Sequence, residues 1–574
     1  MAEPLHAFET DILILGAGGA GLFAALHAKK AAPGCRVAIV VKGLLGKCGC
    51  TRMVQGGYNV ALAPGDSAER HFMDTIEGGK WLNHQELAWL LVTGAQQRIR
   101  ELETEIGCFF DRNPDGTVHQ KAFAGQSFDR TVHKGDLTGI EIINRLAEQV
   151  FARSVDRLED YRALDIIPRS DAGGIAGVLL LDMRSGALVL ARARAVLLAT
   201  GGGPTMYRYH TPSGDKSCDG LAMALRAGLK LRDMEMVQFH PTGLLAGEET
   251  RMTGTVLEEG LRGAGGHLTD STGQRFMPHY DPAAERATRD IVSRAIMDRI
   301  TKGFGGPHGG VFIEMGHLGP ENVRRLFKGM VERCADCGFD LAAGRVEVIP
   351  TAHYMMGGVV FDASCRTSLP GLFAAGEDTG GVHGANRLGG NGVANSTVFG
   401  ALAGEAMAGA LPPGPLPEPD RAALEAAVGR ALGPRGRKPG NLAALRAELA
   451  RVMWEDVGIL RDAASLACAE KGLAALAAAL EQTGVPDLDR RYDLAWTERL
   501  NLENLLLVSR AILKAATLRT DSRGAHFRTD HPATSDLAAS RYTVVCLAGD
   551  QLLASSEPVR FSLVRPGESL LRAA

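Results

Sequence analysis

The chain has 574 residues, of which 45% are hydrophobic and 22% charged, and its formal net charge is −3. This length allows two to four domains with large cores. The net charge itself argues neither for nor against nucleic acid, but no stretch reads as a basic arm, so we expect no nucleic acid partner. The start of the chain has no basic stretch followed by an apolar run and a cleavage site, and no apolar run of about twenty residues follows, so we expect neither a signal peptide nor a spanning helix.

The ten cysteines are scattered, as in reduced cytosolic proteins rather than in a disulfide framework. Cys334 and Cys337 form one CxxC pair, but no second pair stands at zinc-site spacing, so we expect the pair to be structural and the chain to hold no metal. The sequence therefore predicts a cytoplasmic protein. It would reach the cytoplasmic face of a membrane only through partner subunits.

The first element in the chain reads strand, glycine turn, helix, strand. Gly16, Gly18 and Gly21 form GxGxxG between the apolar run "DILIL" and a helix that leads to a second run, "VAIVV". Such glycines permit a tight turn, close approach of the backbone to a pyrophosphate, and close helix–strand packing, with the phosphates at the helix N-terminus. The second strand ends in Lys42 rather than in the acid that binds ribose in NAD enzymes, so a simple NAD dehydrogenase is disfavoured.

Two further strand-like runs follow, each before a helix. "RAVLLATGGG" precedes "DGLAMALRAG", and "PGLFAAGED" precedes "VANSTVFGALAGEAMAGAL". The proline-rich segment 411–420 reads as a linker to alanine- and leucine-rich helices, and "RYTVVCLAG" and "PVRFSLV" suggest a small β tail. We expect an α/β fold with a Rossmann-type dinucleotide domain, an inserted α+β capping domain, a helical domain and the tail. Their expected limits are 1–245 and 346–412 for the dinucleotide domain, 246–345 for the cap, 420–530 for the helical domain and 531–574 for the tail.

Several polar side chains lie in or beside glycine-rich loops. His240 precedes Pro241, His353 follows "VIPTA", and Arg387 sits in "HGANRLGG". Arginine offers a rigid fork of donors for a carboxylate, and histidine can donate another hydrogen bond. Taken singly, each histidine would more often be a core or surface residue. Together they indicate a site for a small anion.

The motifs of the chain, taken in order, carry a family resemblance from about residue 8 to residue 530. They are "TRMVQGGYNVAL", "LLATGGG", "DMEMVQFHPTG", "EEGLRGAGG", "RATRDIVSRAI", "AHYMMGG", "GLFAAGEDTGGVHGANRLGGNG" and "DSRGAHFR". The sequence resembles the flavoprotein subunits of succinate dehydrogenase and fumarate reductase, and their relative L-aspartate oxidase. The resemblance implies FAD, a small dicarboxylate substrate, and hydride transfer between the substrate and flavin N5. It also implies a separate iron–sulfur subunit, because no cluster-ligand pattern appears here, and membrane anchors through that subunit.

The resemblance also implies roles for individual residues. His240, His353 and Arg387 match the positions that hold the dicarboxylate, while Arg289 matches a proton-shuttle arginine with Glu259 as its neighbour. Arg262 completes the motif around Glu259. An arginine can act only by passing a proton along a relay, because its unperturbed pKa is above about 12. The implied flavin contacts are Gly16, Gly18, Gly21, Lys42, Thr51, Gln55, Gly56, Asp219 and Glu377.

Five departures from the family pattern bear on cofactor and substrate. Cys50 stands where succinate dehydrogenases carry the histidine that bonds to the flavin, so we predict non-covalent FAD. Glu258 replaces the usual threonine or serine, and a carboxylate facing a dicarboxylate repels it unless it is protonated or turned away. The loop 243–258 is longer than usual, and Ala264 and Gly392 replace a glutamate and a serine. Which dicarboxylate is preferred stays open, as do the physiological direction and the electron acceptor.

Two other functions compete with the leading one. An L-aspartate oxidase-like enzyme would oxidise aspartate to iminoaspartate, but Phe123 stands in "FAGQS" where aspartate oxidases carry a glutamate for the substrate ammonium. Phe123 therefore favours an acid without an amino group. A protein that keeps FAD for structure alone would not need the complete set of His240, Glu259, Arg289, His353 and Arg387.

Overall fold

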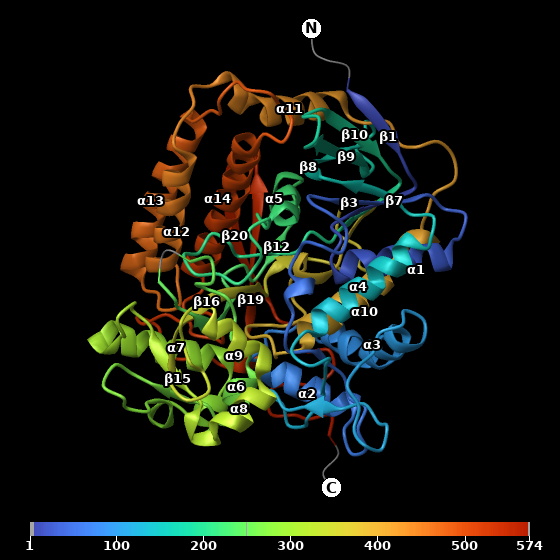
Figure 1. The fold of residues 1–574 in the computed structure, drawn as a ribbon. Helices are drawn as coiled ribbons and strands as arrows, with labels where there is room; N and C mark the ends of the chain where they lie inside the picture. Colours follow the sequence, from blue (N-terminus) through green and yellow to red (C-terminus); the bar gives the residue numbers. More distant parts are fainter. Residues whose placement is uncertain (1–4, 248–249, 572–574) are drawn as a thin grey trace.

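The structure of the chain is a computed structural model that describes residues 5–247 and 250–571 (Figure 1). Its central element is a parallel sheet in the order β18-β11-β2-β3-β7. The strands are β2 (Ile12–Leu15), β3 (Val37–Val41), β7 (Asp156–Glu159), β11 (Ala195–Leu198) and β18 (Leu372–Ala374). The three apolar runs expected to converge on one nucleotide site, β2, β11 and β18, are adjacent strands, so that prediction and the α/β fold class are confirmed.

Two predicted helices, α1 (Gly19–Ala31) and α10 (Asn391–Gly409), pack closely against each other although they lie far apart in the sequence. Two glycines of α10 permit the close approach. A Cβ on Gly400 would lie 2.6 Å from the carbonyl oxygen of Ala20, and one on Gly404 would lie 2.3 Å from that of Ala24. Both distances are too short for a side chain, so the glycines in this helix serve packing.

The N-terminal half carries elements that the sequence did not assign. Strand β1, which precedes the glycine motif, pairs in parallel with β10 at the edge of a sheet in the order β1-β10-β9-β8. These strands are β1 (His6–Glu9), β8 (Tyr161–Pro168), β9 (Ile175–Asp182) and β10 (Leu188–Arg192). The other unassigned elements are α2 (Ala68–Gly78), α3 (Gln85–Thr104), α4 (Thr138–Phe151), β4 (Tyr58–Asn59), β5 (Gln120–Lys121) and β6 (Thr131–Val132). Helix α5 (Asp219–Arg226), by contrast, was predicted from "DGLAMALRAG".

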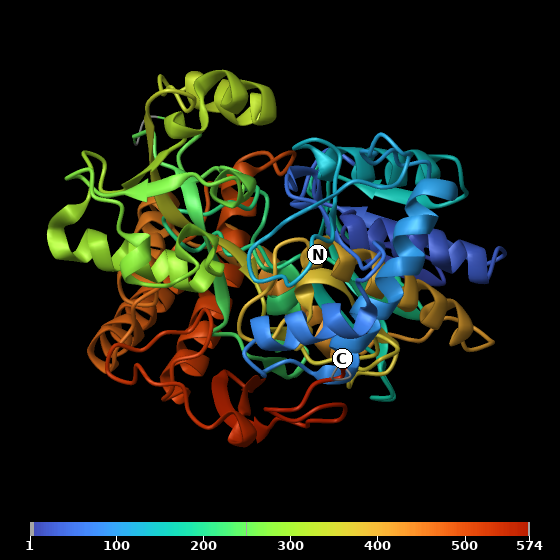
Figure 2. The ribbon, with the colours of Figure 1, turned by 90° about the horizontal axis from the view of Figure 1, so that it is seen from below.

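An antiparallel sheet in the order β13-β16-β15-β14 carries the region between the two nucleotide-binding parts. Its strands are β13 (Val237–Leu244), β14 (His267–Thr269), β15 (Val311–Glu314) and β16 (Arg345–Met355). The helices beside it are α6 (Gly260–Gly263), α7 (Arg289–Arg299), α8 (Pro320–Leu326) and α9 (Lys328–Ala335). They share an apolar core of their own, and Figure 2 shows this green lobe apart from the blue N-terminal elements. We propose 246–345 as the limits of the lobe, with β13 and β16 as the flanking strands that connect it to the two dinucleotide-binding parts.

Four helices follow the proline-rich segment, which is itself free of helix as expected. They are α11 (Arg421–Leu432), α12 (Leu442–Glu455), α13 (Ala463–Gln482) and α14 (Leu494–Leu518), and Figure 1 shows the last three on the side of the molecule opposite α1. By length and composition alone, α13 could cross a membrane, the one such helix among the described residues. One face of α13 is buried, with Leu466, Leu473 and Leu480 at helical spacing, and most of the rest of the helix is not.

The tail forms a sheet in the order β17-β12-β19-β20, of strands β12 (Leu231–Arg232), β17 (Gly358–Val359), β19 (Arg541–Ala548) and β20 (Gln551–Pro558). Strand β19 was expected, but the second strand was predicted over 558–564, which is wrong. Ala548 pairs with Gln551 across a two-residue turn whose first residue, Gly549, has φ 58°. Because the turn has only two residues, the second strand begins directly after it, at Gln551.

Candidate active site

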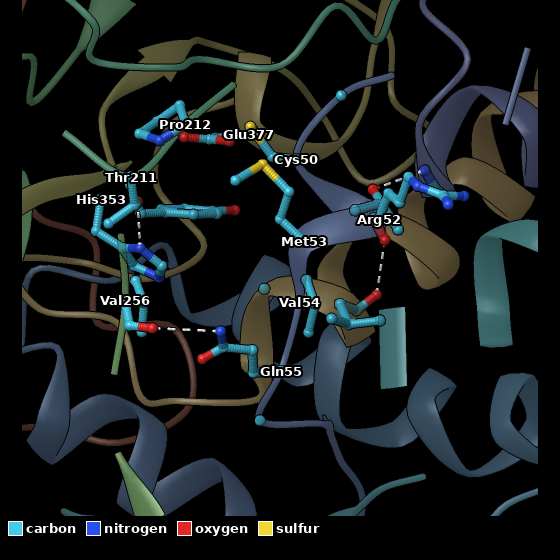
Figure 3. A pocket seen from close by; sticks show the side chains of 18 of the residues that line it. Cys50, Arg52, Met53, Val54, Gln55, Thr211, Pro212, Val256, His353 and Glu377 are labelled. Carbon is cyan, nitrogen blue, oxygen red and sulfur yellow. Dashed lines mark hydrogen bonds between the residues drawn. The ribbon is translucent and has the colours of Figure 1, made fainter. Parts of the chain in front are cut away.

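The main cavity, of about 530 Å³, lies between the glycine turn before α1, the strands β13 and β16, and the start of α10. Figure 3 shows part of its wall, with Cys50 and Glu377 on one side and Gln55 and His353 on another. The predicted site residues on this wall are Gly18, Thr51, Gln55, Gly56, Phe123, His240, Glu259, Arg289, His353, Glu377 and Arg387. The structure therefore brings all the expected substrate residues and most of the expected flavin residues to one cavity.

A second cavity of about 50 Å³ adjoins the first and is lined by Gly16, Lys42 and Asp219. The two share Gly18 and Lys216 in their walls, so they lie side by side at the N-terminus of α1. Predicted flavin residues line both cavities. Gly21 lines neither cavity, and Arg262 lies behind Glu259, 3.8 Å from it.

The glycine turn fits the close approach of a pyrophosphate. Gly16 has φ 112°, and a Cβ there would lie 2.1 Å from the carbonyl oxygen of Ala199, so only glycine fits. A Cβ on Gly21 would lie 2.0 Å from the carbonyl oxygen of Gly16, which explains the third glycine as a packing residue. Gly18 caps α1 without a side chain, and the Gly19 N–H donates to Thr51 Oγ1 at 3.0 Å. These features suit an anion at the start of the helix.

Lys42 and Asp219 are buried partners rather than two independent cofactor contacts. Lys42 Nζ lies 2.8 Å from Asp219 Oδ2, while Oδ1 accepts hydrogen bonds from Arg162 at 2.8 Å and Asn504 at 2.7 Å. Burial opposes ionisation of Asp219, but the charges of Arg162 and Lys42 outweigh it and hold the pKa below its ordinary value. No pattern in the sequence points to Arg162 and Asn504, because both contacts join distant elements.

Glu377 and Cys50 face the same region of the main cavity. Glu377 follows β18, and its Oε1 accepts hydrogen bonds from the N–H groups of Met355 at 3.0 Å and Gly203 at 3.4 Å. Burial raises the pKa of Glu377 to about 7 and that of Cys50 to about 12. Cys50 is therefore a protonated thiol near neutral pH, and Glu377 is a carboxyl group whose charge depends on what binds beside it.

The two histidines come from paired strands. His240 on β13 lies beside a bulge that separates it from Gly243, and its ring centre is 5.4 Å from that of His353 on β16. His240 Nδ1 accepts from the Thr242 N–H at 3.3 Å, which places the ring proton on Nε2. His353 Nδ1 is bonded to Thr211 Oγ1 at 2.7 Å. Burial and nearby arginines lower the pKa of both rings well below the usual value, so both are neutral.

Arg289 and Arg387 donate hydrogen bonds to the same side chain, Gln238, which the sequence analysis missed. Gln238 Oε1 accepts from Arg289 Nη1 at 2.9 Å and from Arg387 Nη2 at 3.1 Å. Arg387 lies over the Tyr354 ring, 4.3 Å from its centre, and burial lowers the pKa of Arg387 to about 10. Gln238 stands two residues before His240, the spacing that places strand residues on one face, and this signal could have found it.

Glu258 lines the cavity but is neither exposed nor alone. Its Oε1 accepts a hydrogen bond from Lys121 Nζ, whose ammonium also lies 5.7 Å from the centre of the Phe123 ring. Burial raises the pKa of Glu258, and the Lys121 charge opposes the rise. Glu258 therefore has a counter-charge, supplied by a residue that the sequence analysis did not single out.

No group of three or more His, Cys, Asp or Glu side chains is placed to hold a metal within residues 5–247 and 250–571. Cys334 of the CxxC pair is buried and Cys337 half-buried, both at the end of α9.

Two family profiles match the chain. The one described as "FAD binding domain" matches residues 11–393, and "Fumarate reductase flavoprotein C-term" matches residues 446–570. Among curated relatives, a subunit of the fumarate reductase (CoM/CoB) of Methanothermobacter marburgensis is 39% identical over 540 residues, 92% of this chain and 95% of the relative. The L-aspartate oxidase of Streptomyces coelicolor is 36% identical over 571 residues, 96% of this chain and 94% of the relative.

A solved structure of Escherichia coli quinol fumarate reductase superposes on the chain with a TM-score of 0.92 at 32% identity. The match covers 98% of this chain and 99% of that one. The similarity therefore extends over the dinucleotide sheet, the inserted lobe and the C-terminal helices together.

Proposed function

The chain belongs to the family of succinate dehydrogenase and fumarate reductase flavoprotein subunits, and from this we propose that it interconverts succinate, or a close dicarboxylate, and its enoate. It is an FAD-dependent oxidoreductase. The observation that carries the proposal is that Arg289, bonded to Glu259, lies on the same cavity wall as Arg387, His240 and His353.

The residues around the glycine turn suit FAD. We propose that Gly16, Gly18, Thr51 and the start of α1 would hold its phosphates, and that Glu377 would accept a hydrogen bond from the ribityl chain. Lys42, Gln55, Gly56 and Asp219 are proposed to complete the site, and Gly21 to support it by packing. When bound, FAD supplies the hydride chemistry at its N5 atom.

Substrate carboxylates are proposed to bind between Arg387 and the two histidines. A neutral His240 with its proton on Nε2 can donate one hydrogen bond, and Arg387 can donate a planar fork. Fixed donors of this kind draw electron density toward the carboxylates and polarise the double bond for hydride attack. Phe123, buried beside Gly56 and Gly389, would add an apolar wall that excludes water.

Arg289 is proposed to donate the proton in reduction and to take it in oxidation. Its guanidinium is fixed by Glu259 on one side and by Gln238 on the other. Because free arginine is a very weak acid, the proton must be replaced at once, and Glu259 with Arg262 behind it offers the route.

We propose that FAD is bound without a covalent link, because a thiol with a pKa of about 12 is a poor nucleophile near neutral pH. Several relatives are named as subunits of fumarate reductases, which are assemblies of more than one chain, and we propose a separate iron–sulfur protein as the electron partner. Membrane-anchor subunits would be reached through that partner, with this chain on the cytoplasmic side.

An L-aspartate oxidase-like activity is the second candidate, since one such relative matches nearly the whole chain and Glu258 lines the cavity. The pairing of Glu258 with Lys121 argues against it, because a carboxylate that already has a cation is a poor partner for a substrate ammonium. The Phe123 ring lies beside the same lysine and offers no charge.

The experiment that tests the function reduces the flavin without oxygen and follows its reoxidation by fumarate, other unsaturated dicarboxylates and iminoaspartate. Fast reoxidation by fumarate, with bleaching of the oxidised enzyme by succinate but not by aspartate, would support the proposal. Reaction with aspartate would establish the second candidate. Reaction with no member of the panel would point to FAD kept for structure alone, or to a different acid selected by Glu258 and the loop 243–258.

A further inference from the structure

The cavity wall contains a buried charge pair that the proposed chemistry does not use. Glu258 stands directly before Glu259, its side chain is 5% exposed, and the residue is part of the cavity wall. Lys121 is not on the cavity wall; it reaches Glu258 from β5, 137 residues away in the sequence. Its side chain is 21% exposed, so the ammonium stands between the cavity wall and solvent.

Other charged groups around Glu258 do not replace Lys121. Asp136, which precedes α4, and Glu259 both disfavour the ionised form of Glu258. Arg333 of α9 lines the same cavity, but its guanidinium donates to the carbonyl of Val256. His133, beside Lys121, has its pKa lowered to about 4 by burial and carries no charge near neutral pH. Lys121 is thus the cation that contacts Glu258.

We propose that Lys121 is a specificity-determining positioning residue, which neutralises Glu258 and thereby allows a cavity with this carboxylate in its wall to bind a dianion. The inference rests on the proposed function. It follows from charge balance, since an unpaired carboxylate in a buried wall repels a second carboxylate far more strongly than it would in water. The Lys121 ammonium lies over the Phe123 ring, 5.7 Å from its centre, while it donates to Glu258, so two contacts hold it in place.

The inference predicts a pH-dependent defect. In Lys121→Met, Glu258 loses its cation. The pKa of Glu258 should then be higher than in the wild type, because burial, Asp136 and Glu259 all favour the protonated form and no lysine opposes them. At pH 8, where an unpaired Glu258 is more ionised, KM for fumarate should rise at least about tenfold with kcat little changed. As the pH falls, Glu258 takes up a proton and KM should return toward the wild-type value.

The test compares KM and kcat for fumarate between pH 6 and pH 8.5 in the holoenzyme, with flavin content measured for each variant. Lys121→Met/Glu258→Gln should restore KM to within about threefold of wild type and remove its pH dependence. Glu258→Gln alone should not raise KM, and Lys121→Arg should behave as wild type. Lys134→Met, at a neighbouring lysine with a 47% exposed side chain paired with Asp111, is the matched control.

Three results would overturn the inference: an unchanged KM in Lys121→Met at every pH, an equal defect in the single and double variants, or a tenfold rise in KM in Glu258→Gln alone. The last result does not depend on Lys121→Met, so the inference stays testable even if that variant does not fold. A rise in KM in Glu258→Gln would mean that Glu258 itself binds the substrate. A wild-type enzyme that neither turns over nor binds any dicarboxylate would instead overturn the proposed function, and this inference with it.

Discussion

One carboxylate oxygen of Glu259 accepts two hydrogen bonds from Arg289, from Nε at 2.8 Å and from Nη2 at 2.6 Å. Both side chains are almost completely buried, at 5% and 8% exposure. The guanidinium therefore cannot turn away from the cavity, and Glu259 Oε1 is left to face Arg262. Arg289 is thus held by one oxygen of Glu259, while the other oxygen faces a third charged group, Arg262. A connected series of charged groups is what a proton relay requires, and an isolated structural ion pair would not need it.

Replacement of Arg289 by lysine should lower kcat for fumarate reduction by about 10² to 10⁴, the range that a positioned proton donor contributes. Dicarboxylate binding should change much less, because Arg387 and the histidines remain. Rapid-mixing reoxidation of the reduced flavin measures the first quantity, and the spectral shift of the oxidised flavin on adding a dicarboxylate measures the second. Arg286→Lys, at an exposed arginine just before α7, is the control. Equal activity in the two variants would refute the relay.

Gln238→Leu should impair binding and catalysis together. The amide oxygen of Gln238 accepts from both Arg289 and Arg387, so its loss leaves two like charges close together in a buried wall. We expect KM to rise and kcat to fall, each by about tenfold, since one hydrogen bond to a charged group is lost from each arginine. Steady-state kinetics on fumarate separates the two effects. A fall in kcat alone would mean that Gln238 serves only Arg289.

The glycine turn and the strands around it were predictable because they are local. Gly21 is required by a contact with Gly16 in the same strand–turn–helix unit. Gly16 is required by a contact with the distant Ala199, but the GxGxxG spacing identified it without that contact. The Lys121–Glu258 and Asp219–Asn504 contacts were not predictable, since each joins elements more than one hundred residues apart without a motif that links them. The second tail strand was misplaced because its position depends on the turn at Gly549 rather than on its own apolar pattern.

The affinity for FAD should increase as the pH rises through about 7. Burial raises the pKa of Glu377 to about 7 in the protein without flavin, and a hydroxyl that donates to the carboxylate favours its ionised form. Binding then lowers this pKa and releases a proton, so below pH 7 the affinity should fall by up to about tenfold per pH unit. Fluorescence titration of flavin-free protein between pH 5.5 and 8.5 measures this dependence. In Glu377→Gln it should be flat, and a slope identical to wild type would remove Glu377 from the flavin site.

FAD should leave the protein on acid precipitation and appear in the supernatant. The thiol of Cys50 has a pKa of about 12 because it is buried, so less than about one molecule in 10⁴ carries the thiolate at pH 7.5, and attack on the flavin is correspondingly slow. Cys50→Ser should therefore retain FAD in the same amount and keep its activity within about twofold, since serine preserves the size of the side chain and no covalent bond is lost. Flavin that stays with the precipitated wild-type protein but not with Cys50→Ser would show that the cysteine bonds to it after all. Cys468→Ser, at an exposed cysteine on α13, controls for general effects of cysteine replacement.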